Sequence, residues 1–512
     1  MSYLLGIDIG TSGTKAVLFD DTGNSLASST YEYPMYQPEN GWAEQEPEDW
    51  WKAVCSSVRD TITQSGVNAA EIKGIGLSGQ MHGAVLLDAA GKVLRRSIIW
   101  CDQRSSSECE QITSLIGRER LVSITANPAL TGFTAAKVMW VRNNEPHIYE
   151  KIKKILLPKD YIRYMLTGEY ATEVSDASGM QYMNVPDRCW SSEVTGKLGV
   201  ESEWLAKLHE SPEITGTVTR QAAALTALAE GTPVVGGAGD QAAGAVGNGI
   251  VHKGVISSTI GTSGVVFAHS DDVSIDPQGR VHTFCHAVPG KWHIMGVTQG
   301  AGLSLKWFRD NFCIEEKRTA ELMGIDPYVL MDKEAEKAAP GSNGLIYLPY
   351  LMGERTPHLD PDARGVFFGL SARHGKQHMI RAILEGVVFS LRDCLEIIRS
   401  MEVAVNEVRA SGGGGRSGIW RQMQADIFGT DIYTVSSGEG PALGVAILAG
   451  VGTGIYGSVR EACDTAVRIK TRQAPDLELK RQYDKYYSLY GGLYGSLKDK
   501  FKELAGISSA SL

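Results

Sequence analysis

Asp240 is the residue whose type and setting most directly suggest chemistry in this sequence. It lies in "GGAGDQAAG", where an apolar stretch typical of a strand gives way to an Ala/Gly-rich helical segment. A carboxylate at such a junction can accept the proton of a hydroxyl group, and the neighbouring glycines allow a ligand to come near. Asp is also a favoured helix N-cap. The residue by itself therefore leaves a general base and a helix cap equally open.

The pentapeptide "IGTSG" occurs twice, at residues 9–13 and 260–264. Each copy lies between two apolar stretches, which predicts the same strand–turn–strand hairpin in both places. A turn of Gly, Thr and Ser offers backbone N–H groups and hydroxyls to a phosphate, with no bulky side chain in the way. Two unrelated glycine turns are the alternative, because a glycine-rich chain raises the chance of a repeat. One copy opens each half of the chain, which favours a duplicated phosphate-binding element.

Two side chains beside the first turn suit a metal–phosphate ligand. Asp8 precedes the turn and is placed to accept hydrogen bonds from waters on Mg²⁺, an ion that keeps several waters and takes few carboxylates. Lys15 follows the turn and can place a positive charge on a phosphate.

Two other glycine-rich stretches have different prospects. "GIGLSG" at residues 74–79 matches GxGxxG, but an apparent strand follows it where a dinucleotide-binding fold requires a helix. "SGGGGRSG" at residues 411–418 lies between a predicted strand and a predicted helix, so its amides can lie against a nucleotide. A flexible strand–helix connection explains the same residues. The Walker A and protein-kinase sequences are absent.

The predicted elements that position these motifs form two α/β halves. The chain starts as a β-meander, and a helix begins near "EPEDW". Residues 103–228 alternate helices with short strands, as in an inserted subdomain. The second half opens with the repeated hairpin and continues with a long amphipathic helix over residues 374–400, a strand leading into a turn at "EVRASGGGG", and helices at 418–429 and 441–450. We expect domains at 1–250 and 251–512.

The composition excludes several classes of protein. The formal net charge of −9 argues against a nucleic-acid partner, which needs a basic face. The eight cysteines include no CxxC pair, so we expect neither a disulfide framework nor a zinc site. No leader-like segment opens the sequence, and no run of 18 apolar residues occurs. We therefore expect a cytoplasmic protein that does not bind a membrane.

Together these motifs resemble the actin-like ATPase superfamily and, within it, the FGGY family of carbohydrate kinases. "GFTAAKVMWVRNN" at residues 132–144 and "GVFFGLSARHGKQHMIRAILE" at residues 365–385 are similar to the two signatures of that family. The resemblance implies an α/β fold with two similar actin-like (ribonuclease H-like) ATPase domains flanking a central cleft. The N-terminal domain would hold the sugar, the first hairpin and Asp240, and the C-terminal domain the second hairpin and the adenosine.

"GQMHG" at residues 79–83, "LPKDY", "YLMGERTPH" and "GPALGVA" are similar to the sequences of family members that phosphorylate D-xylulose. Members that act on glycerol carry an Arg–Glu pair where this chain has Met81 and His82, which disfavours glycerol. The resemblance thus implies transfer of a phosphoryl group from Mg·ATP to the 5-hydroxyl of D-xylulose, with Asp240 as the catalytic base.

The same resemblance implies roles for further residues. Met81, His82 and Gln241 would contact the sugar. Asp102 would either join them or form a surface ion pair with Arg104, and the sequence leaves both open. Mg²⁺ would lie near Asp8. ATP would contact Thr11, Ser12, Gly13, Lys15, Gly261, Thr262, Gly302, Gly413, Gly414 and Ser417, although the family often has Asn where this chain has Ser417 or Gly418.

Two alternatives stay open at this stage. The first is a family kinase for another pentulose or a polyol, for example ribulose. The second is an actin-like ATPase that works as a chaperone or a filament subunit, but such a protein needs neither sugar-kinase signature. In either kinase case the partners are a small sugar and Mg·ATP, with no nucleic acid and no membrane, and a homodimer is an open expectation.

Overall fold

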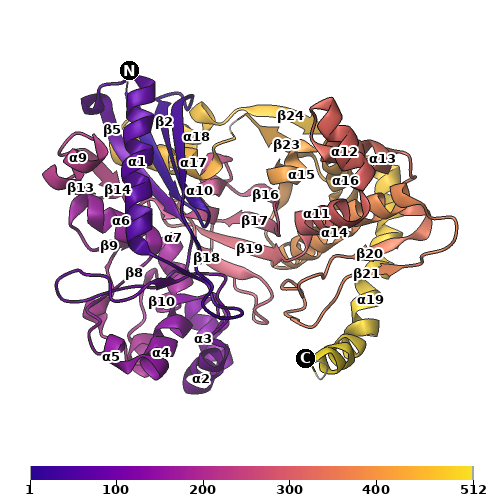
Figure 1. Cartoon of the computed structure of the whole chain (residues 1–512), viewed down its shortest axis with the longest axis horizontal. Helices are drawn as coiled ribbons and strands as arrows, with labels where there is room; N and C mark the ends of the chain where they lie inside the picture. The colour runs from indigo at the N-terminus through magenta and orange to yellow at the C-terminus, as the bar shows by residue number, and fades with distance from the viewer. Residues whose placement is uncertain (1, 437, 510–512) are drawn as a thin grey trace. The chain divides into compact units, whose positions relative to one another are not determined.

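The computed structural model describes residues 2–436 and 438–509. The chain divides into two compact units, many of whose elements are labelled in Figure 1. Unit 1 comprises Met1–His252, His269–His293 and Ser436–Arg468, and unit 2 comprises Lys253–Ala268, Ile294–Val435 and Ile469–Leu512. The first change of unit lies beside the predicted boundary at residue 250. The chain then returns twice to unit 1, so the units are not contiguous in sequence as the predicted domains are.

A seven-stranded sheet forms the centre of unit 1, with the order β13-β14-β5-β1-β2-β3 and a short strand β15 that pairs with β5. The strands are β1 (Tyr3–Ile9), β2 (Gly13–Asp20), β3 (Ser25–Glu32), β5 (Ile72–Gly79), β13 (Ile214–Thr217), β14 (Pro233–Val235) and β15 (Ala238–Gly239). The predicted meander is confirmed, since β1 pairs antiparallel with β2 and β2 with β3.

Helices cover both faces of this sheet. Successive strand residues point to opposite faces, and β1 has apolar side chains on both of them. Leu5 and Ile7 of β1 belong to a buried cluster with Trp50 of α1 (Pro47–Ser65), the helix predicted at "EPEDW". Leu4 lies in a second cluster with Val246 of α10 (Asp240–Gly247) and with α17 (Gly440–Gly452) and α18 (Val459–Ala466).

The glycines of "GIGLSG" serve the contact between β5 and α17. A Cβ atom on Gly76 would lie 1.9 Å from the carbonyl oxygen of Val445, and one on Gly6 of β1 would lie 2.0 Å from that of Ala442. Only glycine permits the helix to approach the sheet so closely. The GxGxxG match is therefore a packing feature, in agreement with the rejection of a dinucleotide site.

Both "IGTSG" copies form the predicted hairpins, but their registers differ by one residue. In the first copy Ile9 pairs with Thr14. In the second, between β16 (Gly254–Ile260) and β17 (Gly264–Ser270), Ile260 pairs with Gly264. The two identical pentapeptides therefore close loops of different length. The register of each hairpin depends on which faces of its flanking strands are buried, because a shift by one residue would turn every side chain to the other face.

The predicted inserted region of unit 1 has a core of its own, which includes Leu121, Val138, Trp140, Tyr182 and Trp204. Its helices are α2 (Ser106–Ile116), α3 (Arg118–Thr125), α4 (Thr134–Asn144), α5 (Pro146–Tyr149), α6 (Pro158–Thr167), α7 (Val174–Ala177), α8 (Ser192–Leu198) and α9 (Arg220–Thr226). Short strand pairs join them: β4 (Glu44–Gln45) with β7 (Ser97–Ile98), β6 (Val85–Leu87) with β8 (Lys154–Leu156), β9 (Ala171–Glu173) with β12 (Lys207–His209), and β10 (Met183–Asn184) with β11 (Cys189–Trp190). Strand β6 follows β5 as predicted but pairs with β8, so the two strands around "GQMHG" are not a hairpin.

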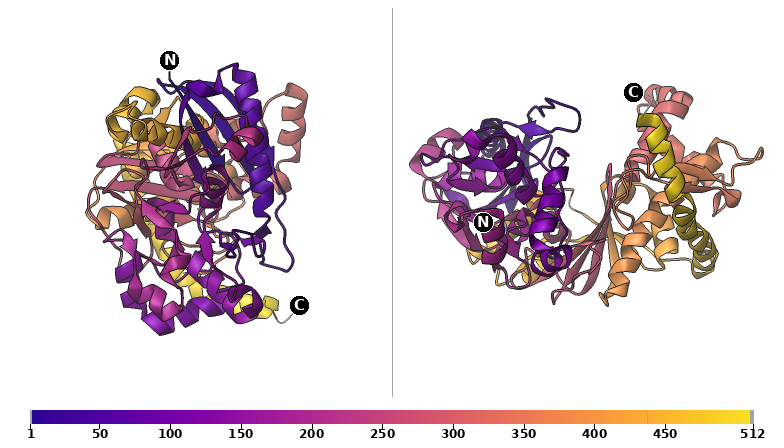
Figure 2. Two further views of the ribbon diagram at one scale, coloured as in Figure 1. Left: turned by 90° about the vertical axis from the view of Figure 1, so that its left-hand side faces the viewer. Right: turned by 90° about the horizontal axis from the view of Figure 1, so that it is seen from below.

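In unit 2 the strands follow the order β17-β16-β22-β23-β24, with β22 (Val405–Ser411), β23 (Ile432–Val435) and β24 (Ile469–Gln473). The remaining strands are β18 (His282–Cys285), which belongs to unit 1, β19 (Trp292–Thr298), most of which belongs to unit 2, and β20 (Ile346–Leu348) and β21 (Val366–Phe368) of unit 2. The helices of unit 2 are α11 (Ala301–Phe312), α12 (Ile314–Met323), α13 (Pro327–Glu336), α14 (Lys376–Ser400), α15 (Gly412–Arg416), α16 (Gly418–Phe428) and α19 (Leu477–Ser509), the last drawn in yellow in Figure 2. The predicted helices at 374–400, 418–429 and 441–450 correspond to α14, α16 and α17.

One local prediction in unit 2 is wrong. The glycines after "EVRAS" form the short helix α15 and not a turn. They allow this helix to lie against β16, since a Cβ atom on Gly414 would be 2.6 Å from Cδ1 of Ile260, and one on Gly412, at φ +69°, would be 2.4 Å from the Ile260 oxygen. Among the helices of residues 2–436 and 438–509, none is long and apolar enough to cross a membrane.

Candidate functional site

Two carboxylates lie at one edge of the unit 1 sheet. Strands β1 and β15 both pair parallel with β5, in a register that aligns Asp8 and Ala238 with Ser78. Asp240 follows β15 directly as the first residue of α10. The carboxyl ends of these three parallel strands therefore meet, which is where open α/β sheets bind their ligands. Gly239, not Asp240, occupies the N-cap position of α10, so the helix-cap alternative is wrong.

The two carboxylates influence each other's protonation. Burial and, after it, the negative charge of Asp8 raise the pKa of Asp240 to about 7, although hydrogen bonds from Gln241 act in the opposite direction. Burial also raises the pKa of Asp8, against the effects of Ser78 and Lys15. The Ser78 hydroxyl donates to Asp8 Oδ1 at 2.7 Å. Like charges in a partly buried site favour the uptake of a proton or a cation.

This donor set fits Mg²⁺. Carboxylate oxygens are ligands that the ion prefers, and one or two of them suffice when waters and phosphate oxygens complete its shell. The part of the chain that the structure describes holds no group of three or more His, Cys, Asp or Glu suited to a metal, so an all-protein cage is not available there. Asp8 remains the residue predicted to lie nearest the ion.

The first hairpin leaves hydrogen-bond donors available at its tip. The Gly10 N–H donates to the Gly13 carbonyl at 3.0 Å, which closes the turn. The Thr11 hydroxyl accepts from the indole of Trp100 at 2.9 Å, and the amide of Gln45 donates to the Thr11 carbonyl at 2.7 Å. Within the described residues, no protein acceptor is bonded to the N–H groups of Thr11 and Ser12. Such a turn with free amides suits a phosphate.

Lys15 lies beside this turn in an ion pair with Glu439, which belongs to the same unit. The predicted contact of Lys15 with a phosphate therefore competes with a carboxylate. An ion pair this exposed contributes little by itself, so exchange of Glu439 for a phosphate costs little.

In unit 2 the predicted nucleotide residues also come together. The N–H groups of Gly302 and Leu303, at the start of α11, donate to the carbonyls of Gly261 and Thr262 at 2.9 and 3.0 Å. The Gly302 position has no room for a side chain, since a Cβ atom would lie 2.3 Å from the Gly261 oxygen. Helix α15, which contains Gly413 and Gly414, packs on β16 directly before this hairpin.

Ser417 has a structural role in addition to the predicted one. Its hydroxyl caps α16 by accepting the N–H of Trp420 at 3.2 Å.

The loop with Met81 and His82 lies against the strand that precedes Asp240. A Cβ atom on Gly239 would be 2.9 Å from Cγ of Met81. His82 adopts a left-handed backbone conformation with φ 69°. Its ring nitrogen Nδ1 lies 3.0 Å from the Gly179 carbonyl, and its ring is 4.7 Å from that of Phe133. The predicted sugar residues and the predicted base are therefore neighbours.

Lys137 of α4 contacts this loop and was missed by the sequence analysis. It lies in the first family signature, is fully buried, and donates from Nζ to the carbonyls of His82 at 2.8 Å and Gly132 at 2.6 Å. Burial lowers its pKa to about 7, against the charge of Asp102. A buried lysine without a paired carboxylate is costly, and it was visible in the sequence as the one charged residue in the apolar stretch "TAAKVMWV".

Asp102 lies in a buried ion pair. Its carboxylate accepts from the N–H of Ala43 at 2.6 Å and from the Arg104 guanidinium at 2.7 Å. Both residues of the pair have side chains only 1% exposed. Of the two alternatives that the sequence left open, the structure favours the ion pair with Arg104, though in the interior and not at the surface. The predicted sugar contact of Asp102 stays a prediction.

A substitution at Gly179 is expected to disturb His82 first, because the His82 ring is its nearest neighbour. A Cβ atom there would lie 2.3 Å from Nδ1 and Cε1 of the His82 ring. We expect Gly179→Ala to raise KM for the sugar by about tenfold or more, the scale on which buried polar contacts discriminate substrates, with kcat reduced less. Gly196→Ala, on α8 with open space around it, is the control and should match the parent. Equal sugar KM values for both variants would show that His82 does not contact the sugar.

Comparison with known proteins assigns the family. The model of the FGGY family of carbohydrate kinases, N-terminal domain, matches residues 3–247, and that of the C-terminal domain matches residues 256–453. The chain therefore belongs to the FGGY family of carbohydrate kinases, and its fold is the two-domain actin-like ATPase fold of that family. The chaperone or filament alternative is thereby set aside.

Individual relatives cover almost the whole chain. A xylulose kinase of Bacillus subtilis (strain 168) is 38% identical over 98% of this chain and 98% of its own. A gluconokinase of Bacillus licheniformis is 35% identical, again over 98% of both chains. The crystal structure of a xylulose kinase from Rhodospirillum rubrum, 29% identical, superposes with a TM-score of 0.89 over 98% of this chain and all of that one.

Proposed function

We propose that the protein transfers the γ-phosphoryl group of Mg·ATP to the 5-hydroxyl of D-xylulose and releases D-xylulose 5-phosphate and ADP. The observation that carries the proposal is the contact of the Met81–His82 loop with Gly239, directly before the partly buried carboxylate of Asp240. This arrangement provides a proton acceptor beside residues suited to hold a polyhydroxy chain.

Asp240 acts as the general base. As the bond from the sugar oxygen to the γ-phosphorus forms and the bond from that phosphorus to the bridging oxygen of ADP breaks, the hydroxyl proton passes to the Asp240 carboxylate. A base with a pKa of about 7 is well matched to this task near neutral pH. His82 and Gln241 orient the sugar, so that its hydroxyl meets the phosphorus in line.

The phosphates are held by backbone amides. The N–H groups of Thr11 and Ser12 donate to phosphate oxygens from unit 1, and the hairpin at Gly261 and Thr262 is the corresponding element of unit 2. Asp8 would hold Mg²⁺ through its waters, and the bound ion supplies positive charge that offsets charge on the phosphates. That both hairpins serve one nucleotide stays a prediction, as do the adenosine contacts of Gly302, Gly413, Gly414 and Ser417.

Gluconate is the second candidate substrate, because a relative of nearly the same similarity is a gluconokinase. A sugar acid would need a positive group in the sugar site. Lys137 of α4, which contacts the His82 loop, already donates from Nζ to two backbone carbonyls, and burial lowers its pKa to about 7. D-Xylulose, which is uncharged, therefore fits the site better.

A substrate panel tests the proposal. The purified protein is incubated with Mg·ATP and D-xylulose, L-xylulose, D-ribulose, L-ribulose, D-gluconate, glycerol or no sugar, and both ADP and the phosphorylated product are measured. We expect D-xylulose to give the highest kcat/KM. Highest turnover with another member of the panel would move the substrate assignment while keeping the mechanism. ATP turnover that no sugar stimulates would overturn both.

Two expectations stay predictions alongside this proposal, namely a homodimer and a location in the cytoplasm. The mass of the protein in solution at micromolar concentration tests the first. Fractionation of the cells that produce the protein tests the second.

A further inference from the structure

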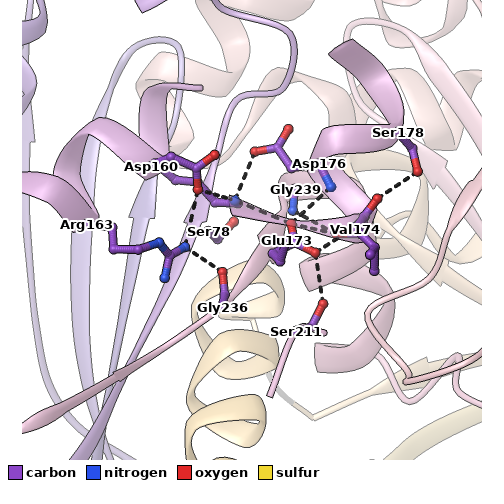
Figure 3. A network of polar contacts seen from close by, with 12 residues as sticks. Ser78, Asp160, Arg163, Glu173, Val174, Asp176, Ser178, Ser211, Gly236 and Gly239 are labelled. Carbon is purple, nitrogen blue, oxygen red and sulfur yellow. Dashed lines mark hydrogen bonds and ion pairs between the residues drawn. The ribbon is translucent and has the colours of Figure 1, made fainter. Parts of the chain in front are cut away.

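A fully buried network of charged side chains lies next to the strand that leads to Asp240 (Figure 3). Lys159 of α6 forms ion pairs with Asp160 at 2.8 Å and with Glu173 and Asp176 at 3.3 Å each. Arg163, one turn further along the same helix, pairs with Asp160 at 3.3 Å. All five side chains are at most 1% exposed. Such a network is expensive to bury, and hydrophobic residues of similar volume are often more stabilising.

The network holds the segment before Asp240 at two points. At the first, the Arg163 guanidinium donates to the carbonyls of Val235 at 2.5 Å and Gly236 at 2.6 Å. At the second, the hydroxyl of Ser175 accepts the N–H of Gly239 at 3.2 Å. Gly239 is covalently joined to Asp240, so the second point fixes the backbone from which the carboxylate projects.

Glu173 determines how the Ser175 hydroxyl is oriented. The hydroxyl proton is directed at Glu173 Oε1, 3.0 Å away, which leaves a lone pair of the oxygen for the Gly239 N–H. Glu173 is fixed in turn, because it is the N-cap of α7 and accepts the N–H groups of Ser175 at 2.7 Å and Asp176 at 3.0 Å. The hydroxyl of Ser211 donates to its other oxygen at 3.0 Å.

Asp176 completes the network without a hydrogen bond to either of its carboxylate oxygens in the described structure. Burial raises its pKa well above the ordinary value, although Lys159 acts in the opposite direction. Lys159 and Arg163 are the positive partners of the three acids, so a proton on Asp176 would make the network neutral.

We propose that Glu173 and Ser175 are positioning residues for the general base: the Glu173 carboxylate orients the Ser175 hydroxyl, which holds the Gly239 N–H and thereby the position of Asp240 relative to the sugar hydroxyl. The inference rests on the proposed role of Asp240. It extends that role to two fully buried residues from a different part of the chain.

The test compares two serines that make the same bond to Glu173. Ser175→Ala removes a hydroxyl that donates to Glu173 and also holds Gly239. Ser211→Ala, the matched control, removes an equally buried hydroxyl that donates to Glu173 alone. We expect Ser175→Ala to lower kcat by about 10- to 100-fold, the scale that a small misplacement of a catalytic group produces. KM for sugar and ATP should change little, and Ser175→Thr, which restores the hydroxyl, should recover most of kcat.

Two readouts separate positioning from a general loss of structure. Ser175→Ala and Ser211→Ala should lower the melting temperature by similar amounts, while only Ser175→Ala lowers kcat strongly. In an Asp240→Asn background, Ser175→Ala should not reduce the residual rate further, because the group that it positions is already lost. Equal effects of the two serine variants on kcat, or full additivity of Ser175→Ala with Asp240→Asn, would overturn the inference.

The same set of variants separates this inference from the proposed function. If Asp240→Asn keeps the parent rate, the assignment of the base fails. If Asp240→Asn is inactive while Ser175→Ala behaves like Ser211→Ala, the base stands and the positioning role of Glu173 and Ser175 fails.

Discussion

Asp240→Asn is expected to lower kcat by about 10²- to 10⁴-fold, the range that a positioned general base contributes. Asn keeps the size of the side chain and can accept a hydrogen bond from Gln241, but it cannot take up the hydroxyl proton. KM for D-xylulose and ATP should stay within about threefold, because the substitution removes an interaction made as the bonds change and not in the ground state. Steady-state kinetics with varied sugar and varied ATP measure both quantities.

The same substitution, which lowers kcat, should raise the stability of the folded protein above neutral pH. The pKa of Asp240 is raised in the folded protein to about 7, so the folded state binds its proton more tightly than the unfolded state does. The free energy of unfolding therefore falls as pH rises from about 4 to 7. Asp240→Asn removes this loss, and its melting temperature should exceed that of the parent at pH 8, with the difference disappearing near pH 4.

The pH dependence of catalysis gives a third readout of the same residue. In the parent, kcat/KM should decrease below about pH 7 as Asp240 becomes protonated. Asp60→Asn, on α1 with a carboxylate bonded to Tyr31, serves as the control and should match the parent in kcat and in the pH profile. The assignment of the base would be contradicted if the Asp240→Asn variant kept the kcat of the parent. It would also be contradicted if kcat/KM of the parent did not decrease at acidic pH.

Local signals in the sequence predicted the parts of the site that lie in contiguous stretches. The two "IGTSG" hairpins, the helix that starts at Asp240 and the strand that carries Asp8 each follow from residues within one stretch, because strand periodicity and turn residues act locally. The identity of the pentapeptides did not predict their registers. Ile9 and Ile260 pair differently because burial of the flanking strands decides the register.

The supports of the site come from distant residues, which no local pattern indicates. Ser78 reaches Asp8 across 70 positions, and Ser175 reaches Gly239 across 64. The glycines of β5 are needed because α17, a helix from a much later segment of the chain, packs closely against that strand. Asp102 illustrates the same limit. The sequence suggested Arg104 as its ion-pair partner, but it did not indicate that the pair is buried. Contacts of this kind depend on the tertiary fold, and sequence reasoning from one chain finds the groups but not their partners.

The second large effect is expected at Lys159, the positive centre of the buried network. Its side chain is fully buried between Asp160, Glu173 and Asp176. Burial alone would lower the pKa of this lysine, but the three carboxylates raise it, so it is charged in the folded protein. Lys159→Met leaves three buried acids with Arg163 as their remaining partner. Breaking a buried ion pair from one side costs about 3–5 kcal/mol of unfolding free energy.

Urea unfolding of Lys159→Met and the parent measures this loss, and its pH dependence identifies the cause. Without Lys159 the remaining acids escape the cost of buried charge by binding protons, so the loss should be smaller at pH 5 than at pH 8. Lys197→Met, which removes an exposed lysine paired with Glu193 on α8, should unfold close to the parent at both values. A Lys159→Met protein as stable as the parent, or a loss independent of pH, would show that the network does not depend on its lysine. Because Glu173 belongs to this network and orients the Ser175 hydroxyl, the same variant should also lose kcat under conditions in which it remains folded.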